Sequence, residues 1–202
     1  MTILIIIITS VVSFAAFRQR SLVEKLQFNA SKIVHNNEYH RLITHAFVHA
    51  NWEHLIVNMI VLFSFGSAVE NYFGYEFGQK ATFYYILLYL GGILFSNLYA
   101  IFRYKNDFYY NAVGASGAVS AVVFSAIFFD PWNPVYFFGL IKFPGIVFAV
   151  LYLAYSYYMS RKQTDNVAHD AHFLGALFGF VFPILIDPSL MRNFLDKLFM
   201  VL

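Results

Sequence analysis

The chain has 202 residues, of which 60% are hydrophobic and only 12% are charged, and its mean hydropathy is +0.62. Soluble domains carry roughly 25% charged residues, so this composition excludes an ordinary water-soluble globule and indicates a membrane protein. The net charge of +2 is too small to suggest a nucleic-acid partner. The absence of cysteine excludes disulfides, a thiolate nucleophile and cysteine metal sites.

Six apolar runs predict membrane-spanning helices, because each is near the roughly 20 residues that cross the hydrocarbon layer. The first run ends at Arg18 and could be a signal peptide, but it lacks the basic start of such a segment, so we predict a retained span. The fourth run stops before two closely spaced prolines, Pro131 and Pro134. We therefore expect an all-α membrane protein, a single six-transmembrane-helix domain over 1–202. The predicted spans are approximately 1–17, 52–72, 80–102, 112–129, 140–159 and 167–186.

The segments outside these spans differ in character. Residues 21–51 form the longest polar connection, and a loop of that length usually has structure or function of its own. Residues 191–202 are predicted to form a short amphipathic tail. We expect the Tyr and Phe side chains of the third and fifth spans to face lipid.

Polar residues gather at the starts of the second, fourth and sixth spans. An even number of spans makes these three helices start from the same side, and at 1.5 Å per residue their first two turns lie at similar depth. Polar groups inside a membrane are costly and usually functional, although the small residues around Ser116 could serve helix packing alone. A site shared by the three helices is the leading interpretation. Its candidate residues are His54, Asn58, Ser116, His169, Asp170 and His172.

The residue types favour acyl-transfer chemistry. Ser116 is a possible nucleophile, which needs a base, and His172 could be that base because imidazole titrates near neutrality. Gly175 and Gly179 form a small-xxx-small pair, which would let the sixth helix approach the Gly/Ala surface around Ser116. Close approach of the two helices would bring the imidazole within reach of the hydroxyl.

The other polar residues of this cluster have supporting or structural interpretations. His54 and Asn58 share one helix face and could donate hydrogen bonds to a developing oxyanion, or form only an interhelical hydrogen bond. His169 is expected to cap the helix or support its neighbours. Asp170 is not expected to act as a triad acid, because it lies on a different helix face from His172.

No metal or other cofactor is predicted. His45 and His49 are four residues apart and could ligate a metal if helical, but we favour a hydrogen-bonding role for His49. The chain has no His-Glu-x-x-His motif, which removes the usual intramembrane metalloprotease interpretation.

These motifs resemble those of the rhomboids, a family of intramembrane serine proteases with six core helices, over nearly the whole chain. Gly114-Ala-Ser-Gly117 resembles the family's Gly-x-Ser-Gly, which implies Ser116 as the nucleophile. Ala171-His-Phe-Leu-Gly-Ala-Leu-Phe-Gly179 resembles its Ala-His-x-x-Gly-x-x-x-Gly, which implies His172 as the general base. His54-Leu-Ile-Val-Asn58 resembles its His-x-x-x-Asn, which with the Ser116 backbone N–H implies the oxyanion hole.

Further positions agree with the family pattern or depart from it. Glu70 resembles a structural glutamate at the end of the family's second helix, and Arg41 falls where the family has Trp-Arg, with His40 in place of the tryptophan. In some members a tyrosine four residues after the nucleophile stacks on the histidine. Here that position is Ser120, which cannot stack, so another residue must hold the His172 ring.

The resemblance implies a serine endopeptidase that cleaves transmembrane segments of other membrane proteins with a Ser-His dyad. Its partners would be single-span or other transmembrane substrates and the lipid bilayer, with no nucleic acid. The alternatives are a catalytically silent relative that binds membrane-protein clients and, less favoured, a small transporter. The chain keeps both dyad residues, and its polar groups cluster at one membrane face, which favours the protease.

Two criteria give opposite membrane orientations. The predicted loops on the Ser116 side hold nine Lys and Arg residues and the other side holds four, which by the positive-inside rule places the site in the cytoplasm. The family resemblance implies a plasma or inner membrane with the site open to the extracytoplasmic side. We follow the family, because part of residues 21–51 is expected to pack as folded structure.

Overall fold

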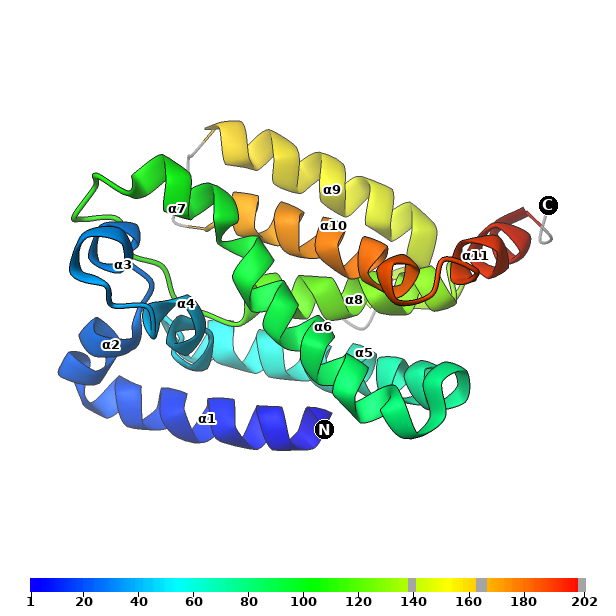
Figure 1. The fold of residues 1–202 in the computed structure, drawn as a ribbon, viewed down its shortest axis with the longest axis horizontal. Coiled ribbons are helices and arrows are strands. Elements are labelled where there is room, and N and C mark those ends of the chain that lie inside the picture. Colours follow the sequence, from blue (N-terminus) through cyan, green and yellow to red (C-terminus); the bar gives the residue numbers. More distant parts are fainter. Residues whose placement is uncertain (138–140, 163–166, 200–202) are drawn as a thin grey trace.

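The computed structural model describes residues 1–137, 141–162 and 167–199, and helices make up most of them (Figure 1). The long helices of this described part pack into one bundle. They are α1 (Thr2–Arg18), α5 (Trp52–Phe77), α6 (Ala81–Ser96), α8 (Ser116–Phe129), α9 (Gly145–Lys162) and α10 (His169–Ile186).

Shorter helices, turns and strands lie at the two ends of the bundle. At one end lie α2 (Arg20–Leu26), α3 (Ala30–Asn36), α4 (Arg41–Thr44), the 3-10 turn η1 (His45–Phe47) and α7 (Leu98–Tyr104) (Figure 1). At the other end lie the 3-10 turn η2 (Gly78–Lys80), the antiparallel strands β1 (Pro134–Phe137) and β2 (Ile141–Pro144), and α11 (Leu190–Phe199).

Each of the six predicted spans contains a long helix, but four of them differ from their predicted extent. The second helix continues to Phe77 rather than ending at residue 72. The third helix breaks at Asn97, whose side chain donates 2.7 Å to the carbonyl oxygen of Ile93 and so competes with the backbone ladder. The fourth begins at Ser116 rather than at residue 112, because Ala112 pairs with Phe28 in a β-bridge and the chain then turns at Gly114, whose φ is +114°. The fifth begins at Gly145, after a hairpin; residue 140, its predicted start, and residues 200–202 of the predicted tail lie outside the described residues.

Only some of these helices are long and apolar enough to cross a bilayer. Within the described residues, Trp52–Tyr104 and His169–Ile186 contain windows long and apolar enough to cross a bilayer, whereas Thr2–Arg18 and Ser116–Phe129 are apolar but shorter. A helix of the length of α8 rises about 21 Å, less than the hydrocarbon thickness of about 30 Å. Every residue of α8 from Gly117 to Phe129 is buried against other helices, so lipid is excluded from it by protein.

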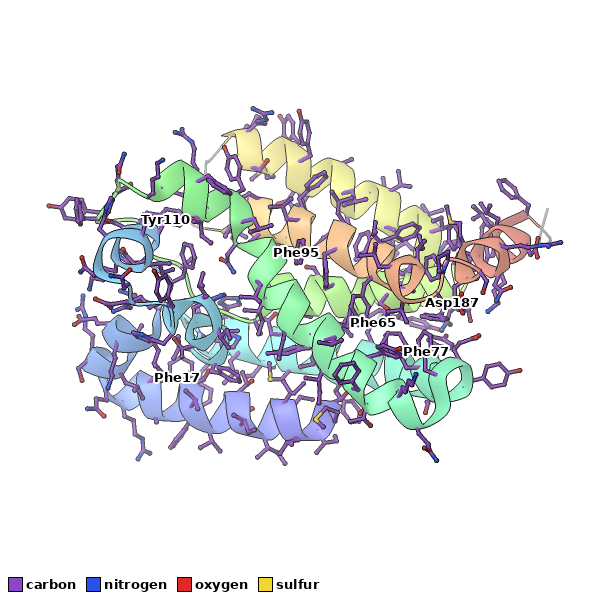
Figure 2. All side chains as sticks on the ribbon, viewed as in Figure 1. Phe17, Phe65, Phe77, Phe95, Tyr110 and Asp187 are labelled. Carbon is purple, nitrogen blue, oxygen red and sulfur yellow. The ribbon has the colours of Figure 1, made fainter. Side chains whose placement is uncertain are left out.

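The expectation that aromatic residues of the third and fifth spans face lipid is partly wrong. On α6, Tyr85 and Tyr89 are fully buried, and the Tyr85 hydroxyl lies 2.7 Å from the Thr2 hydroxyl of α1. On α9, by contrast, Tyr157 and Tyr158 are exposed, and side chains project from the outer faces of α1 and α9 (Figure 2). An all-apolar helix carries no pattern that tells its inner face from its lipid face, so sequence could not separate these tyrosines.

The closest helix contact in the bundle joins α8 and α10. A Cβ atom added to Gly175 would overlap the carbonyl group of Gly117, and one added to Gly179 would overlap the carbonyl oxygen of Ala121. The predicted small-xxx-small contact is therefore confirmed, and its partners are backbone atoms of the helix that begins at Ser116.

The segment between α1 and α5 is folded, as expected. Its centre is the buried Arg41, which is 3% exposed. The guanidinium Nη1 donates to the carbonyl oxygens of Glu24 (2.9 Å) and Gln27 (2.8 Å), and Nε donates to Glu38 at 2.6 Å. One charge therefore holds the turns that connect α2, α3 and α4.

Two buried histidines connect this segment to the chain that leads into α8. The backbone N–H of Gly114 donates to the carbonyl oxygen of His45 (3.0 Å), whose ring Nε2 lies 3.0 Å from the Asn97 amide. The N–H of Ala115 donates to His49 Nε2 at 3.4 Å. Both rings therefore take part in hydrogen bonds, which favours the structural role over metal ligation.

The hydrogen bonds of His49 define its neutral form. Its Nδ1 lies 2.9 Å from the Ser13 hydroxyl, which donates its own proton to the carbonyl oxygen of Phe47. Nδ1 must then carry the ring proton and Nε2 must accept. Burial lowers the pKa of His49 from 6.5 to about 3 and that of His45 to about 4.

The α8–α10 contact predicts a sharp difference between two glycine substitutions. Gly179→Ala should lower stability by about 1–3 kcal/mol, because the new methyl meets backbone that cannot move aside. Gly74→Ala, on α5, meets nothing within 4 Å and should be neutral or stabilising by up to about 1 kcal/mol. Thermal unfolding of the detergent-solubilised variants measures both; equal midpoints would contradict the contact.

The neutral histidines predict a loss of stability in acid. The unfolded chain takes up protons below about pH 6.5, while the folded chain keeps His45 and His49 neutral until about pH 4 and 3. The free energy of unfolding is therefore fully present above pH 6.5 and should fall by about 2 kcal/mol per histidine at pH 5.

Thermal unfolding at pH 7 and pH 5 measures this loss. His49→Gln should reduce the difference between the two pH values by about half, whereas His40→Gln, at an exposed histidine of the same segment, should leave it unchanged. A wild-type protein that is equally stable at both pH values would contradict the prediction.

Candidate active site

The structure brings Ser116 and His172 into direct contact. Ser116 is the first residue of α8, and His172 lies in the first turn of α10. The serine Oγ is 2.7 Å from the histidine Nε2, the distance of a good hydrogen bond to a hydroxyl. A hydroxyl so placed can pass its proton to the imidazole as it attacks an electrophile.

The position of Ser116 at a helix start gives it a second chemical property. The first N–H groups of an α-helix have no acceptor within the helix, and the helix dipole makes this end positive. The backbone N–H of Ser116 is therefore available for a developing negative charge close to the attacking hydroxyl.

The turn before Ser116 requires a glycine. Gly114 has a φ of +114°, which strains any residue with a side chain. A Cβ at Gly114 would also lie 2.8 Å from His54 Nε2. Glycine therefore lets the chain turn into α8 and lets the His54 ring lie against that turn, two residues from Ser116.

His54 and Asn58 are held by local hydrogen bonds at the start of α5. The Asn51 side chain accepts from the backbone N–H of His54 at 2.8 Å and caps the helix. Asn58 is buried, and its Nδ2 donates to the carbonyl oxygen of His54 at 2.9 Å; the amide carries a second N–H. The His54 ring meets the His49 ring edge to face at 4.9 Å.

Two polar residues precede His172 in the first turn of α10. His169 is buried, and its ring meets that of His172 edge to face at 5.9 Å, which is compatible with the expected supporting role. Asp170 lies half-buried in the first turn of α10, and its exclusion as an acid stays a prediction.

Ser120 does not leave the histidine without an aromatic neighbour. Its hydroxyl lies 2.7 Å from the hydroxyl of Tyr152 on α9, and the Tyr152 ring lies nearly parallel to His172. Sequence reasoning identified the gap at Ser120 but missed Tyr152, because α9 carries many aromatic residues and only the fold separates them. The one available signal was a serine inside an apolar run, which needs a polar partner.

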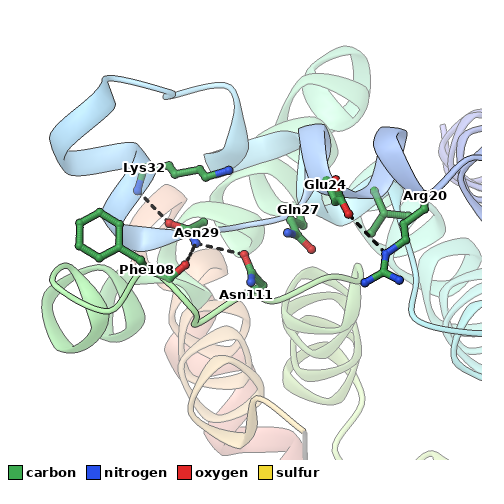
Figure 3. Close-up of a pocket in the computed structure, with 8 residues that line it drawn as sticks. Arg20, Glu24, Gln27, Asn29, Lys32, Phe108 and Asn111 are labelled. Atoms are coloured by element: carbon green, nitrogen blue, oxygen red, sulfur yellow. Dashed lines mark hydrogen bonds and ion pairs between the residues drawn. The ribbon is translucent and has the colours of Figure 1, made fainter.

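Asn29 also escaped the sequence analysis. Its Oδ1 caps α3 by accepting from the Lys32 N–H, and its Nδ2 donates to the carbonyl of Phe108 and to the side chain of Asn111 (Figure 3). It thus ties the first polar segment to the loop before α8. A cavity of about 480 Å³ opens beside it, and within the described residues none of the candidate catalytic side chains lines this cavity.

Comparison with known proteins agrees with the motifs. The rhomboid domain model matches residues 36–188. "RHOMBOID-like protein 12, mitochondrial" of Arabidopsis thaliana is 24% identical over 180 residues, covering 82% of this chain and 51% of that protein. "RHOMBOID-like protein 6, mitochondrial" of the same plant is 36% identical over 100 residues, covering 49% of this chain and 29% of that protein.

The chain spans about half the length of the first of these relatives and less than a third of the second. The family model nevertheless matches well over half of the chain, including every residue of the predicted site. This chain belongs to the rhomboid family.

Proposed function

We propose that this protein is an intramembrane serine endopeptidase that cleaves transmembrane segments of other membrane proteins. Ser116 is its nucleophile and His172 its general base. The observation that carries the proposal is the 2.7 Å contact between these two side chains, made by residues 56 positions apart in a chain of the rhomboid family.

The first chemical step forms an acyl-enzyme. Ser116 Oγ attacks the carbonyl carbon of the scissile bond while its proton moves to His172 Nε2. The negative oxygen of the tetrahedral intermediate accepts hydrogen bonds from the Ser116 backbone N–H and from the His54 and Asn58 side chains. His172 then gives the proton to the leaving amine, and the carbon–nitrogen bond breaks.

The second step uses water and the same groups. His172 takes a proton from water as its oxygen attacks the ester carbonyl, and then returns a proton to Ser116 Oγ. Water must therefore reach Ser116. In this proposal water reaches Ser116 from the end of the bundle where α8 begins. The polar segment between α1 and α5 and the loop before α8 lie at that end (Figure 1).

The membrane arrangement is part of the proposal. The six spans are α1, α5, α6 with α7, α8, α9 and α10, in a plasma or inner membrane, with the site opening to the extracytoplasmic side. The buried Arg41 is not a free loop charge of the kind that the positive-inside rule counts, because it holds folded turns together. Without it the count on the Ser116 side falls from nine to eight, against four, so the orientation follows the family rather than the charges.

The dyad predicts which serine reacts with an activated phosphonate. The wild-type protein should be labelled by a fluorophosphonate probe and should cleave a single-span model substrate, and Ser116→Ala should abolish both. His172→Ala should slow both by about 10²–10⁴-fold, the usual contribution of a general base.

The control is Ser125→Ala, a buried serine on the same helix, which should react like the wild type. Cleavage that survives in Ser116→Ala would refute the assignment. A wild-type protein that binds the substrate but neither cleaves it nor reacts with the probe would identify the alternative, a silent family member that holds membrane-protein clients.

Membrane orientation can be tested with a matched pair of tyrosines in this cysteine-free chain. Tyr109, in the loop before α8, is 92% exposed, and Tyr75, near the opposite end of α5, is 90% exposed. In intact cells a membrane-impermeant maleimide should label Tyr109→Cys, and should label Tyr75→Cys only after permeabilisation. The reverse pattern would place the site on the cytoplasmic side.

A further inference from the structure

We infer that Tyr152 of α9 is a positioning residue that holds the His172 imidazole in line with Ser116, through its ring face on one side and its hydroxyl bond to Ser120 on the other. The inference rests on the proposed function. It assigns to the fifth long helix a part in the chemistry that none of the sequence motifs indicates.

The first observation is the relation of the two rings. The Tyr152 and His172 rings are 20° from parallel, with centroids 6.4 Å apart. Offset, near-parallel aromatic rings attract within this range of distances. The His169 ring lies edge-on to His172, with an interplanar angle of 76°. The imidazole is therefore flanked by one ring face and one ring edge, which restrict its rotation.

The second observation is that the Tyr152 ring is itself fixed. Its hydroxyl is 2.7 Å from Ser120 Oγ, and Ser120 follows Ser116 by about one turn on the same face of α8. The ring also packs against Phe124 of α8 and Phe148 of α9, each with a centroid distance of 5.6 Å. The helix that carries the nucleophile thus anchors the group that orients the base.

The chemistry explains why such a support matters. In the proposed dyad the proton passes directly between Ser116 Oγ and His172 Nε2. The rate therefore depends on the direction of the imidazole, and the packed rings restrict that direction. Proton transfer requires Nε2 to stay near 2.7 Å from Ser116 Oγ, and a misplacement of about 1 Å can cost about 10²-fold in rate. Rotation of an unsupported imidazole away from the hydroxyl would remove the base without removing the residue.

The pairing of residue types also fits. Ser120 is too short to reach and stack on the imidazole, and on its own it would be a buried hydroxyl in an apolar run. A tyrosine from α9 supplies the ring and satisfies that hydroxyl at once. The serine and the tyrosine together do what a single aromatic residue at position 120 could do alone.

The test measures the second-order rate of inactivation by a fluorophosphonate, a small probe whose reaction does not depend on substrate docking. Tyr152→Leu removes the ring and should lower the rate by on the order of ten-fold. Tyr152→Phe keeps the ring and should stay within about three-fold of the wild type. Tyr158→Leu, the same substitution at an exposed position of the same helix, should equal the wild type.

Two further readouts separate positioning from general loss of structure. With the single-span substrate, Tyr152→Leu should lower kcat and leave KM unchanged. Ser120→Ala and Tyr152→Phe each remove the same hydroxyl bond, so the double variant should be no slower than the slower single variant. If Tyr152→Leu does not fold, Tyr152→Met, a second flexible apolar replacement, takes its place in the assay.

The outcomes distinguish the inference from the function it rests on. Suppose that the wild type reacts with the probe and Ser116→Ala does not. If Tyr152→Leu is then inactivated as fast as Tyr158→Leu, the positioning role is wrong but the proposed protease function is supported. A rise in KM with unchanged kcat also overturns the role, because it would place Tyr152 at substrate binding. If the wild type itself fails to react at Ser116, the proposed function falls first.

Discussion

The arrangement of the site depends on the close approach of α8 and α10. Gly175 and Gly179 present no side chain, so backbone atoms of α10 meet the backbone of Gly117 and Ala121 directly. In lipid, helix association gains little from the hydrophobic effect, and such van der Waals contact of small residues takes its place. The contact begins within a turn of Ser116 and His172, which explains why their side chains reach each other.

A second constraint acts on the chain that enters α8. Ala112 pairs with Phe28 through two backbone hydrogen bonds. The N–H of Gly114 donates to the backbone carbonyl oxygen of His45, and the N–H of Ala115 donates to the ring Nε2 of His49. The His49 ring can accept only while it is neutral, and burial keeps it neutral. Residues 21–51, which the sequence suggested to be a long polar connection, therefore form a folded support for the chain that enters α8. This support fixes the position of Ser116 at the start of that helix.

Sequence reasoning predicted the parts of the site that depend on residue identity at fixed spacing. The glycines after His172 make the predicted close contact with the helix of Ser116, and the structure brings Ser116 and His172 together as expected. The oxyanion role of His54 and Asn58 stays a prediction. Sequence reasoning could not predict contacts between residues that are far apart in the chain. Nothing local distinguishes Tyr152 from the other tyrosines of α9, or predicts that Asn29 reaches Asn111, because these contacts join residues 32 and 82 positions apart.

The two residues of the proposed dyad have differently packed surroundings. Ser116 is on α8, where every residue from Gly117 to Phe129 is buried. The Tyr152 ring beside His172 comes from α9, whose buried residues in the described part are only Gly145, Ala149 and Ser156. The hydroxyl bond between Ser120 and Tyr152 bridges these two environments. In the proposed role of Tyr152, the direction of the His172 imidazole therefore depends on the position of α9, which has few buried residues. The position of Ser116 depends on α8, which is almost entirely buried.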